Sequence, residues 1–107
     1  MTKQFTDENF QNEVIEASKT KPVLIDFYAV WCGPCKMQGP IIDEVATLMG
    51  DKAVVGKLNT DEAQATAIKF GVMSIPTLMI FRDGALKETM VGVQRKEGLI
   101  ELLKKYF

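Results

Sequence analysis

Cys32 and Cys35 are the only cysteines among the 107 residues of the chain, and they lie three positions apart. Residues at this spacing share one face of a helix, so the two sulfur atoms can meet with their Cα atoms roughly 5–6 Å apart. A disulfide that closes so short a loop adds only about 2 kcal/mol of stability in the chain-entropy model. The spacing therefore favours thiol–disulfide exchange over a purely structural crosslink.

The surroundings of the pair predict different roles for the two cysteines. An apolar run ends just before them and a helical pattern follows, so we expect Cys32 at the N-terminus of a helix. Unpaired backbone N–H groups and the positive end of the helix dipole favour a thiolate there. Cys35 would lie one turn deeper, shielded from large partners. We therefore expect Cys32 to attack a substrate disulfide and Cys35 to resolve the mixed disulfide.

Two other interpretations of the cysteines stay open at this point: buried thiols without a redox role, and a metal site. A zinc site needs about four ligands, and the chain has no histidine to add to two thiolates. A metal carrier would need a second chain or carboxylate ligands. The sequence also lacks a glycine-rich dinucleotide fingerprint and a phosphate-binding Gly-Lys loop. We expect no bound metal and no cofactor.

Charge and hydropathy narrow the class of protein further. The 13 basic and 14 acidic side chains give a net charge of −1, which argues against a nucleic-acid or membrane-surface binder. No apolar stretch approaches the ~20 residues that span a bilayer. The N-terminal segment lacks the basic tip and apolar run of a secretory signal. We expect a cytoplasmic protein without nucleic-acid or membrane partners.

The elements that must position the cysteines alternate along the chain. Six of the seven residues in segment 23–29 are apolar or aromatic, which is typical of a central strand covered on both faces. Asp83-Gly84 between two apolar segments predicts a β-hairpin. We predict strands at residues 3–5, 23–29, 53–58, 77–81 and 86–91, and helices at residues 32–49 and 61–70, with a first helix after Thr6 and a last helix that includes residues 99–106.

This alternation of strands and helices predicts the fold class. Strands separated by helices form the parallel part of a sheet, and the closing hairpin adds an antiparallel part. We therefore predict an α/β protein with a central mixed sheet flanked by helices on both faces. Its length is that of one ordinary domain, covering residues 1–107.

Local signals predict how three of the helices begin or bend. Thr6 is a good N-cap residue for the first helix, with Phe5 and Phe10 placed as a hydrophobic staple around it. Asp61 is placed to cap the helix that runs to residue 70. Pro40 falls inside the helix that follows the cysteines and should bend it.

Residues 27–36 have the sequence FYAVWCGPCK, and further matching positions follow along nearly the whole chain. These positions are Asp26, Pro40, Lys57, Ile75-Pro76-Thr77, Asp83-Gly84 and Gly92. A bare Cys-x-x-Cys is a weak signal, but Trp-Cys-Gly-Pro-Cys with these downstream partners is highly specific. The sequence resembles the thioredoxin family.

The resemblance implies a thioredoxin-like fold and an electron carrier that reduces protein disulfides. Such a carrier would act as a monomer on disulfide-containing client proteins and be recharged by a thioredoxin reductase-type electron donor. The missing nucleotide motif agrees with electrons that arrive from a partner protein. The Gly33-Pro34 dipeptide separates the chain from oxidising relatives, which often carry a histidine between their cysteines, and so favours a reductant.

The resemblance also assigns roles to Asp26 and Lys57. From sequence alone, Asp26 could be a solvent-facing carboxylate and Lys57 a strand lysine whose ammonium reaches water. The resemblance instead implies a buried Asp26 carboxyl beneath Cys35 that relays a proton to or from that thiol. Burial should raise the pKa of Asp26. The resemblance places the Lys57 ammonium near Asp26, where its charge would oppose the raised pKa.

An uncharged docking patch for protein disulfides is the last feature that the resemblance implies. Its members are Trp31, Gly33, Pro34, Ile75, Pro76, Gly92 and Val93. The Ile75–Pro76 bond would be cis and packed against the cysteines, and residue 75 would offer main-chain hydrogen bonds to an extended substrate. A rival hypothesis is a non-enzymatic scaffold that uses the same patch without turnover.

The chain departs from the usual residues of the family at several positions around these features. These positions are Tyr28, Val30, Gln38-Gly39 and Met73-Ser74. None of them alters the chemistry of the cysteines. They bear on which partners, including which reductase, recognise this surface.

Overall fold

Five strands form one mixed sheet in the computed structural model, which describes residues 1–107. The strand order is β1-β3-β2-β4-β5. The strands are β1 (Lys3–Phe5), β2 (Val23–Tyr28), β3 (Val54–Asn59), β4 (Thr77–Arg82) and β5 (Ala85–Val91). β1, β3 and β2 run parallel, whereas β4 is antiparallel to β2 and β5 is antiparallel to β4. The predicted mixed sheet, with a closing antiparallel hairpin, is confirmed.

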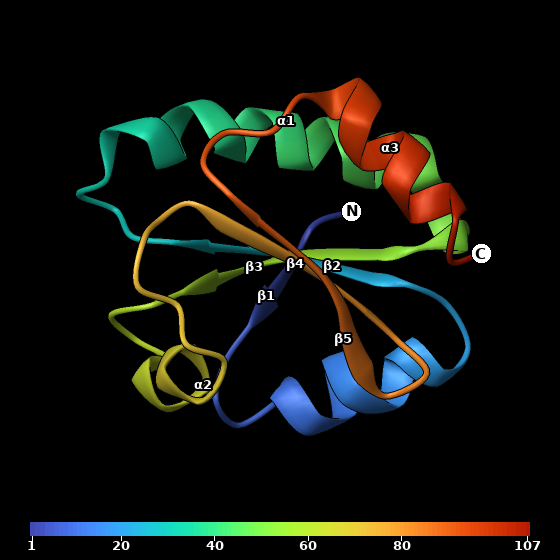
Figure 1. The fold of residues 1–107 in the computed structure, drawn as a ribbon, viewed down its shortest axis with the longest axis horizontal. Helices are drawn as coiled ribbons and strands as arrows, with labels where there is room; N and C mark the ends of the chain where they lie inside the picture. The colour runs from blue at the N-terminus through green and yellow to red at the C-terminus, as the bar shows by residue number, and fades with distance from the viewer.

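Helices cover both faces of this sheet, as predicted (Figure 1). They are α1 (Gly33–Met49), α2 (Gln64–Lys69), α3 (Lys96–Lys104) and three short segments, η1 (Gln11–Glu16), η2 (Ala17–Lys19) and η3 (Gly50–Lys52). α1 and α3 lie on one face, and α2 lies with η1 and η2 on the other (Figure 1). None of the helices combines the length and apolar composition needed to cross a membrane.

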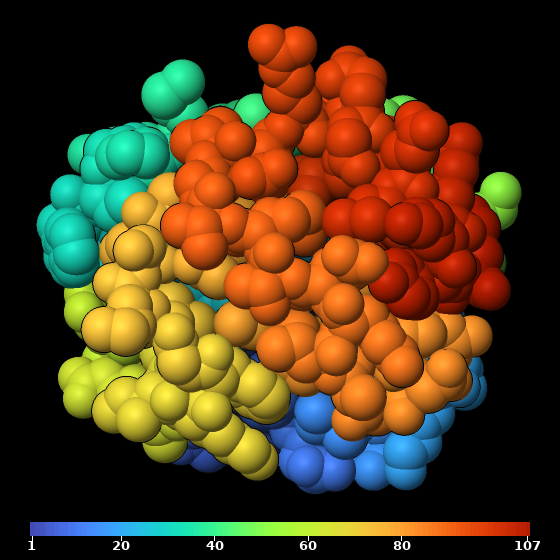
Figure 2. Space-filling model, viewed as in Figure 1, coloured from blue at the N-terminus to red at the C-terminus, as the bar shows by residue number.

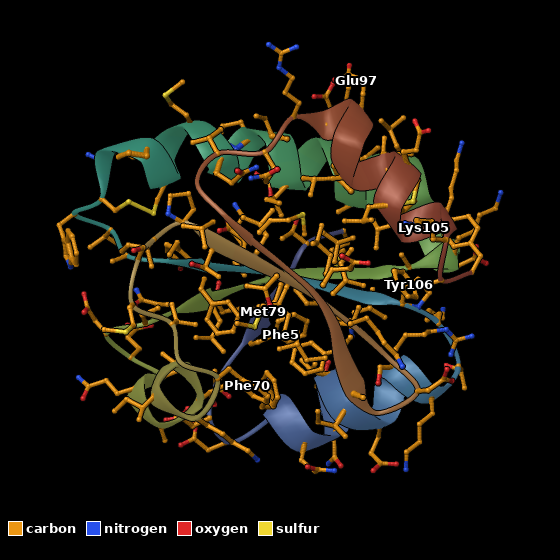
Figure 3. The ribbon with its side chains drawn as sticks, in the orientation of Figure 1. Phe5, Phe70, Met79, Glu97, Lys105 and Tyr106 are labelled. Carbon is orange, nitrogen blue, oxygen red and sulfur yellow. A yellow bond between two sulfur atoms is a disulfide. The ribbon has the colours of Figure 1, made fainter.

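The central strand β2 separates two apolar cores. Successive side chains of a strand point to opposite faces, so Leu24 packs toward α1 and α3, and Ile25 packs toward η1. Fully buried partners on the first face include Ile42, Val45, Leu78, Ile80, Leu99 and Leu103. Figure 3 shows Phe5, Phe70 and Met79 packing into the core on the second face. By the same alternation, Asp26 points to the α1 face.

The hairpin between β4 and β5 has the two-residue turn that its sequence predicts. Asp83 and Gly84 both adopt positive φ, 58° and 79°, as a type I′ turn requires. Ser18 in η2 holds this turn, because its carbonyl accepts from the Asp83 N–H at 2.7 Å and its Oγ accepts from the Gly84 N–H at 2.9 Å. The turn is thereby tied to the helical layer beneath it.

The local capping signals are only partly realised. Thr6 Oγ1 accepts a hydrogen bond from the Asn9 N–H at 3.0 Å, and Asn9 Oδ1 accepts from the Thr6 N–H at 2.8 Å. Thr6 therefore caps this turn as predicted, but regular helix begins only after Phe10 and has π-helical geometry in η1. Pro40 lies inside α1, which continues unbroken as one helix.

The prediction that Asp61 caps the second helix is wrong. α2 begins at Gln64, and no side chain of its own N-cap residue bonds its first turn. Asp7, which lies far away in sequence, supplies the carboxylate: its Oδ1 accepts from the Thr66 N–H at 2.9 Å and from the Thr66 hydroxyl at 2.6 Å. These bonds hold the pKa of Asp7 below its usual range.

Candidate active site

The two cysteines lie at the junction between β2 and α1, as the sequence predicts. Cys32 occupies the N-cap position, with φ −87° and ψ 115°, and Pro34 stands in the first turn. Cys32 and Cys35 form a disulfide with Cα atoms 5.3 Å apart. The Cys35 backbone N–H points at Cys32 Sγ, at 3.2 Å. In the reduced protein this donor and the helix N-terminus both favour a Cys32 thiolate.

The two sulfur atoms face different surroundings, although both residues are buried in the disulfide form. Cys32 Sγ lies 3.7 Å from the carbonyl oxygen of Ile75, in the segment that precedes β4. Cys35 instead lines a pocket that also contains Asp26. The difference between the cysteines is therefore one of neighbours, because burial alone does not distinguish them.

Three loops meet around the Cys32 side of the disulfide. The β2–α1 connection, the segment before β4 and the loop from β5 to α3 lie at the same end of the sheet (Figure 1). The Ile75–Pro76 bond is cis, as the family resemblance implies. The Gly92 N–H donates to the Pro76 carbonyl at 2.9 Å, which joins two of the loops. In Figure 2 the atoms around the start of α1 (teal) border the chain that leads into β4 (yellow).

The surface around these loops is apolar and exposed. Trp31 is 68% exposed, and Val93 is 40% exposed. The Trp31 indole N–H donates to Asp61 Oδ2 at 2.8 Å, which fixes the ring beside the disulfide. Sequence reasoning assigned Asp61 to a helix cap and so missed this contact. A local signal could not have found it, because the two residues come from different loops.

Asp26 is a buried carboxyl group beneath the active site. The residue is 1% exposed, and neither carboxylate oxygen has a hydrogen-bond partner. It lines a pocket of about 390 Å³ together with Cys35, Tyr28, Gly39 and Lys57; we call this the Asp26 pocket. Burial raises the pKa of Asp26 to about 7; Lys57 opposes this rise and Asp43 adds to it. The carboxyl group therefore changes protonation near neutral pH.

The Lys57 ammonium binds Asp43 on α1. The family resemblance instead implied a position near Asp26. Lys57 is the register partner of Asp26 on the neighbouring strand β3. Its Nζ, however, lies 3.1 Å from Asp43 Oδ1, while Asp26 has no direct partner. The charge of Lys57 still opposes the raised pKa of Asp26, as expected.

Asp43 is a residue of this site that sequence reasoning missed. Besides Lys57, it accepts a hydrogen bond from the Thr2 hydroxyl at 2.7 Å. Burial works against its charge, but the bonds from Thr2 and Lys57 hold the pKa of Asp43 below its usual range. Its position on α1, eight residues after Cys35, was the available signal, since that spacing returns to within a quarter turn of the same direction on a helix.

A helix-capping disulfide beside an exposed apolar surface, in a mixed sheet covered on both faces, is the arrangement of a thiol–disulfide oxidoreductase. Comparison with known sequences agrees with this class. A family model described as Thioredoxin matches residues 1–105. The chain belongs to the thioredoxin family, and its Cys32–Cys35 pair makes it a disulfide reductase.

Similar curated proteins extend over almost the full chain. Thioredoxin of Bacillus subtilis (strain 168) is 50% identical over 101 residues, which are 94% of this chain and 93% of the relative. Thioredoxin of Rickettsia prowazekii (strain Madrid E) is 46% identical over 105 residues, 98% of each chain. Thioredoxin 1 of Synechococcus elongatus is 48% identical over 101 residues, 94% of this chain and 92% of the relative.

Proposed function

We propose that the chain is an electron carrier in which Cys32 attacks the disulfide of a client protein and Cys35 resolves the product. The observation that carries this assignment is the different placement of the two sulfur atoms. Cys32 caps α1 and contacts Ile75 at the loop surface, whereas Cys35 lines the Asp26 pocket. Only the first position combines thiolate stabilisation with a place beside the exposed loop surface that a large partner would contact.

The proposed reaction transfers two electrons from the reduced pair to the client. The Cys32 thiolate attacks one client sulfur, and the other client sulfur leaves as a thiolate that takes up a proton. Cys35 then loses its proton and attacks Cys32 Sγ, so that the Cys32–client bond breaks and the second client sulfur leaves. The protein ends as the Cys32–Cys35 disulfide, and the client as a dithiol.

We propose that Asp26 accepts the proton from Cys35 in the second step. Both groups line the same pocket, and a pKa of about 7 lets the carboxyl group exist in either form near neutral pH. Lys57 and Asp43 tune that pKa in opposite directions. Lys57 therefore acts through Asp26.

The docking surface in this proposal consists of three loop segments. They contain Trp31, Gly33, Pro34, Ile75, Pro76, Gly92 and Val93. The exposed Trp31 ring and the bond between Gly92 and Pro76 support a preformed apolar surface. Binding to such a surface depends on the shape and the accessible backbone of the client more than on complementary charge.

We propose that the chain works as a monomeric single domain, residues 1–107, in the cytoplasm. A reductant must be returned to its dithiol form, which suits a reducing compartment. The sequence has no nucleotide-binding fingerprint, so electrons would come from a separate thioredoxin reductase-type protein. Disulfide-containing proteins would be its clients.

Cysteine replacement tests the assignment of roles. Cys35→Ser should accumulate a mixed disulfide with insulin through Cys32, visible as a covalent adduct that dithiothreitol releases. Cys32→Ser is the matched control and should form none. Adduct formation through Cys35 in that control would overturn the assignment. A scaffold without turnover would bind its partner equally well when both cysteines are replaced, which would overturn the proposed function itself.

A further inference from the structure

Gln38 is a buried amide that joins α1 to a loop 56 positions away in sequence. The residue has no exposed surface. Its Nε2 donates to the Gln94 carbonyl at 3.1 Å, and its Oε1 accepts from the Gln94 N–H at 2.6 Å. One side chain thus satisfies both backbone groups of Gln94, as a neighbouring strand would.

The loop held in this way carries part of the proposed docking surface. It follows β5 and contains Gly92 and Val93, and Gly92 has a positive φ of 90°. On one side the Gly92 N–H binds the Pro76 carbonyl at 2.9 Å. On the other side Gln38 holds Gln94, whose own side chain donates to the Gly92 carbonyl at 3.2 Å. The loop is therefore fastened on one side to the segment before β4 and on the other side to α1.

The position of Gln38 on α1 relates this loop to the cysteines. Gln38 follows Cys35 by three residues, so both side chains lie on the same face of the helix. An apolar residue of similar volume would fill the space but leave two backbone groups of Gln94 without partners. Gln94 is half-buried, and a backbone group that is shielded from water costs more stability when it loses its partner than the hydrogen bond itself contributes. The amide is thus suited to fix the loop at a set place relative to the disulfide.

We propose that Gln38 is a positioning residue that holds the Gly92–Val93 loop in place for protein substrates. This inference rests on the proposed function, because it concerns the same docking surface. Gln38 touches neither sulfur atom in this role. It acts through Gln94 and selects for large disulfide substrates that contact the loop, while small disulfides reach Cys32 without it.

The test compares a large and a small disulfide substrate in the variant Gln38→Met, which keeps the side-chain length but removes the amide. Reduction of insulin and of 5,5′-dithiobis(2-nitrobenzoate) is measured with dithiothreitol as electron source. The ratio of kcat/KM for insulin to kcat/KM for the small disulfide should fall by about three- to tenfold. The fall should come from KM for insulin. An unchanged ratio would overturn the inference.

Ser18→Ala is the matched control for a loss of stability. Ser18 is also fully buried and bonded to the backbone of a distant turn, but it holds the β4–β5 hairpin. This variant should lower the free energy of unfolding and keep the substrate ratio of the wild type. If both variants lower the ratio equally, the effect belongs to general stability and the positioning role fails.

Hydrogen exchange on the wild-type protein gives a second test that needs no folded variant. The Gln94 amide lies in a loop, yet it should exchange at least tenfold more slowly than the exposed amides of neighbouring residues. Exchange as fast as its neighbours would overturn the inference. The proposed function fails separately: wild-type protein that reduces no insulin refutes that function, whereas active protein with a freely exchanging Gln94 amide refutes only the role of Gln38.

Discussion

The variant Asp26→Ala should be more stable than the wild-type protein at neutral pH. This gain in the free energy of unfolding should disappear in acid. Burial raises the pKa of Asp26 from 3.8 to about 7, which is a shift of roughly three units. Each unit corresponds to 1.36 kcal/mol, so the ionised group costs the folded state about 4 kcal/mol above pH 7. Alanine removes that cost and should also slow the resolution of mixed disulfides, because Cys35 loses its proton acceptor.

The sign of the pH dependence follows from which state binds the proton more tightly. The folded state does, because its pKa is the higher one. Wild-type stability therefore falls as pH rises from 3.8 to about 7, and the cost is absent below that range. The advantage of Asp26→Ala should grow by about 1.4 kcal/mol per pH unit within this window. The smaller side chain adds a pH-independent loss of about 1–2 kcal/mol.

Urea unfolding of the oxidised proteins between pH 3 and pH 8.5 measures this difference directly. At pH 8 Asp26→Ala should be more stable than wild type by about 2–3 kcal/mol, and at pH 3 it should be less stable by about 1–2 kcal/mol. Asp26→Asn is the matched control: it removes the charge but keeps the volume, and its difference curve should have the same slope. A difference that does not change with pH would refute the reasoning.

Three further substitutions test other contacts. Lys57→Met should raise the pKa of Asp26 further, because it removes the opposing charge; NMR titration of the Asp26 carboxyl carbon measures this. Ser18→Ala leaves a backbone N–H of the hairpin turn without its acceptor and should lower the free energy of unfolding by about 1–3 kcal/mol in urea. Gly56→Ala would push a Cβ into the ring of Phe5, and the same assay should register a loss of about 1–3 kcal/mol.

Two of these substitutions, Lys57→Met and Gly56→Ala, have a matched control in the chain. Lys52→Met removes an exposed lysine and should leave the pKa of Asp26 in place; a fall of that pKa in Lys57→Met would contradict the assigned charge effect. Gly98→Ala adds a Cβ that meets nothing within 4 Å, so it should not destabilise α3. Equal losses from Gly56→Ala and Gly98→Ala would show that the close approach of β1 to β3 is not the cause.

Features set by local sequence were predictable in detail. The apolar run of β2 identified the central strand, since only a strand covered on both faces is apolar at nearly every position. Asp83-Gly84 identified the hairpin because few residues tolerate positive φ. The cysteines were placed correctly at the start of α1 because strand and helix patterns meet at Cys32.

Contacts between distant segments were not predictable in the same way. Asp61 obeys the local rule for a helix cap, yet Asp7 reaches α2 from 59 positions away and Asp61 bonds Trp31. Lys57 forms an ion pair with Asp43 because the strand register and the facing helix together decide which carboxylate the ammonium reaches. Periodicity gives the face on which a residue lies, but not the partner that packs against that face.

Gln38 illustrates the same limit within the candidate site. A glutamine in a helix is usually a surface residue, and the sequence marks it only as a departure from the family. Its amide became significant once the β5–α3 loop was known to present the backbone of Gln94 to it. The folded chain alone shows that this half-exposed loop offers the backbone of Gln94 to a buried side chain.

The proposed function depends most on a sulfur pair that gives two electrons to a protein disulfide. Reduced wild-type protein, mixed with excess insulin and then alkylated, tests this directly by mass spectrometry. We expect Cys32 and Cys35 both to escape alkylation, because they have formed a disulfide, and one insulin disulfide to be opened for each protein molecule. Two alkylated cysteines beside intact insulin, or two thiols that neither insulin nor the alkylating agent reaches, would contradict it.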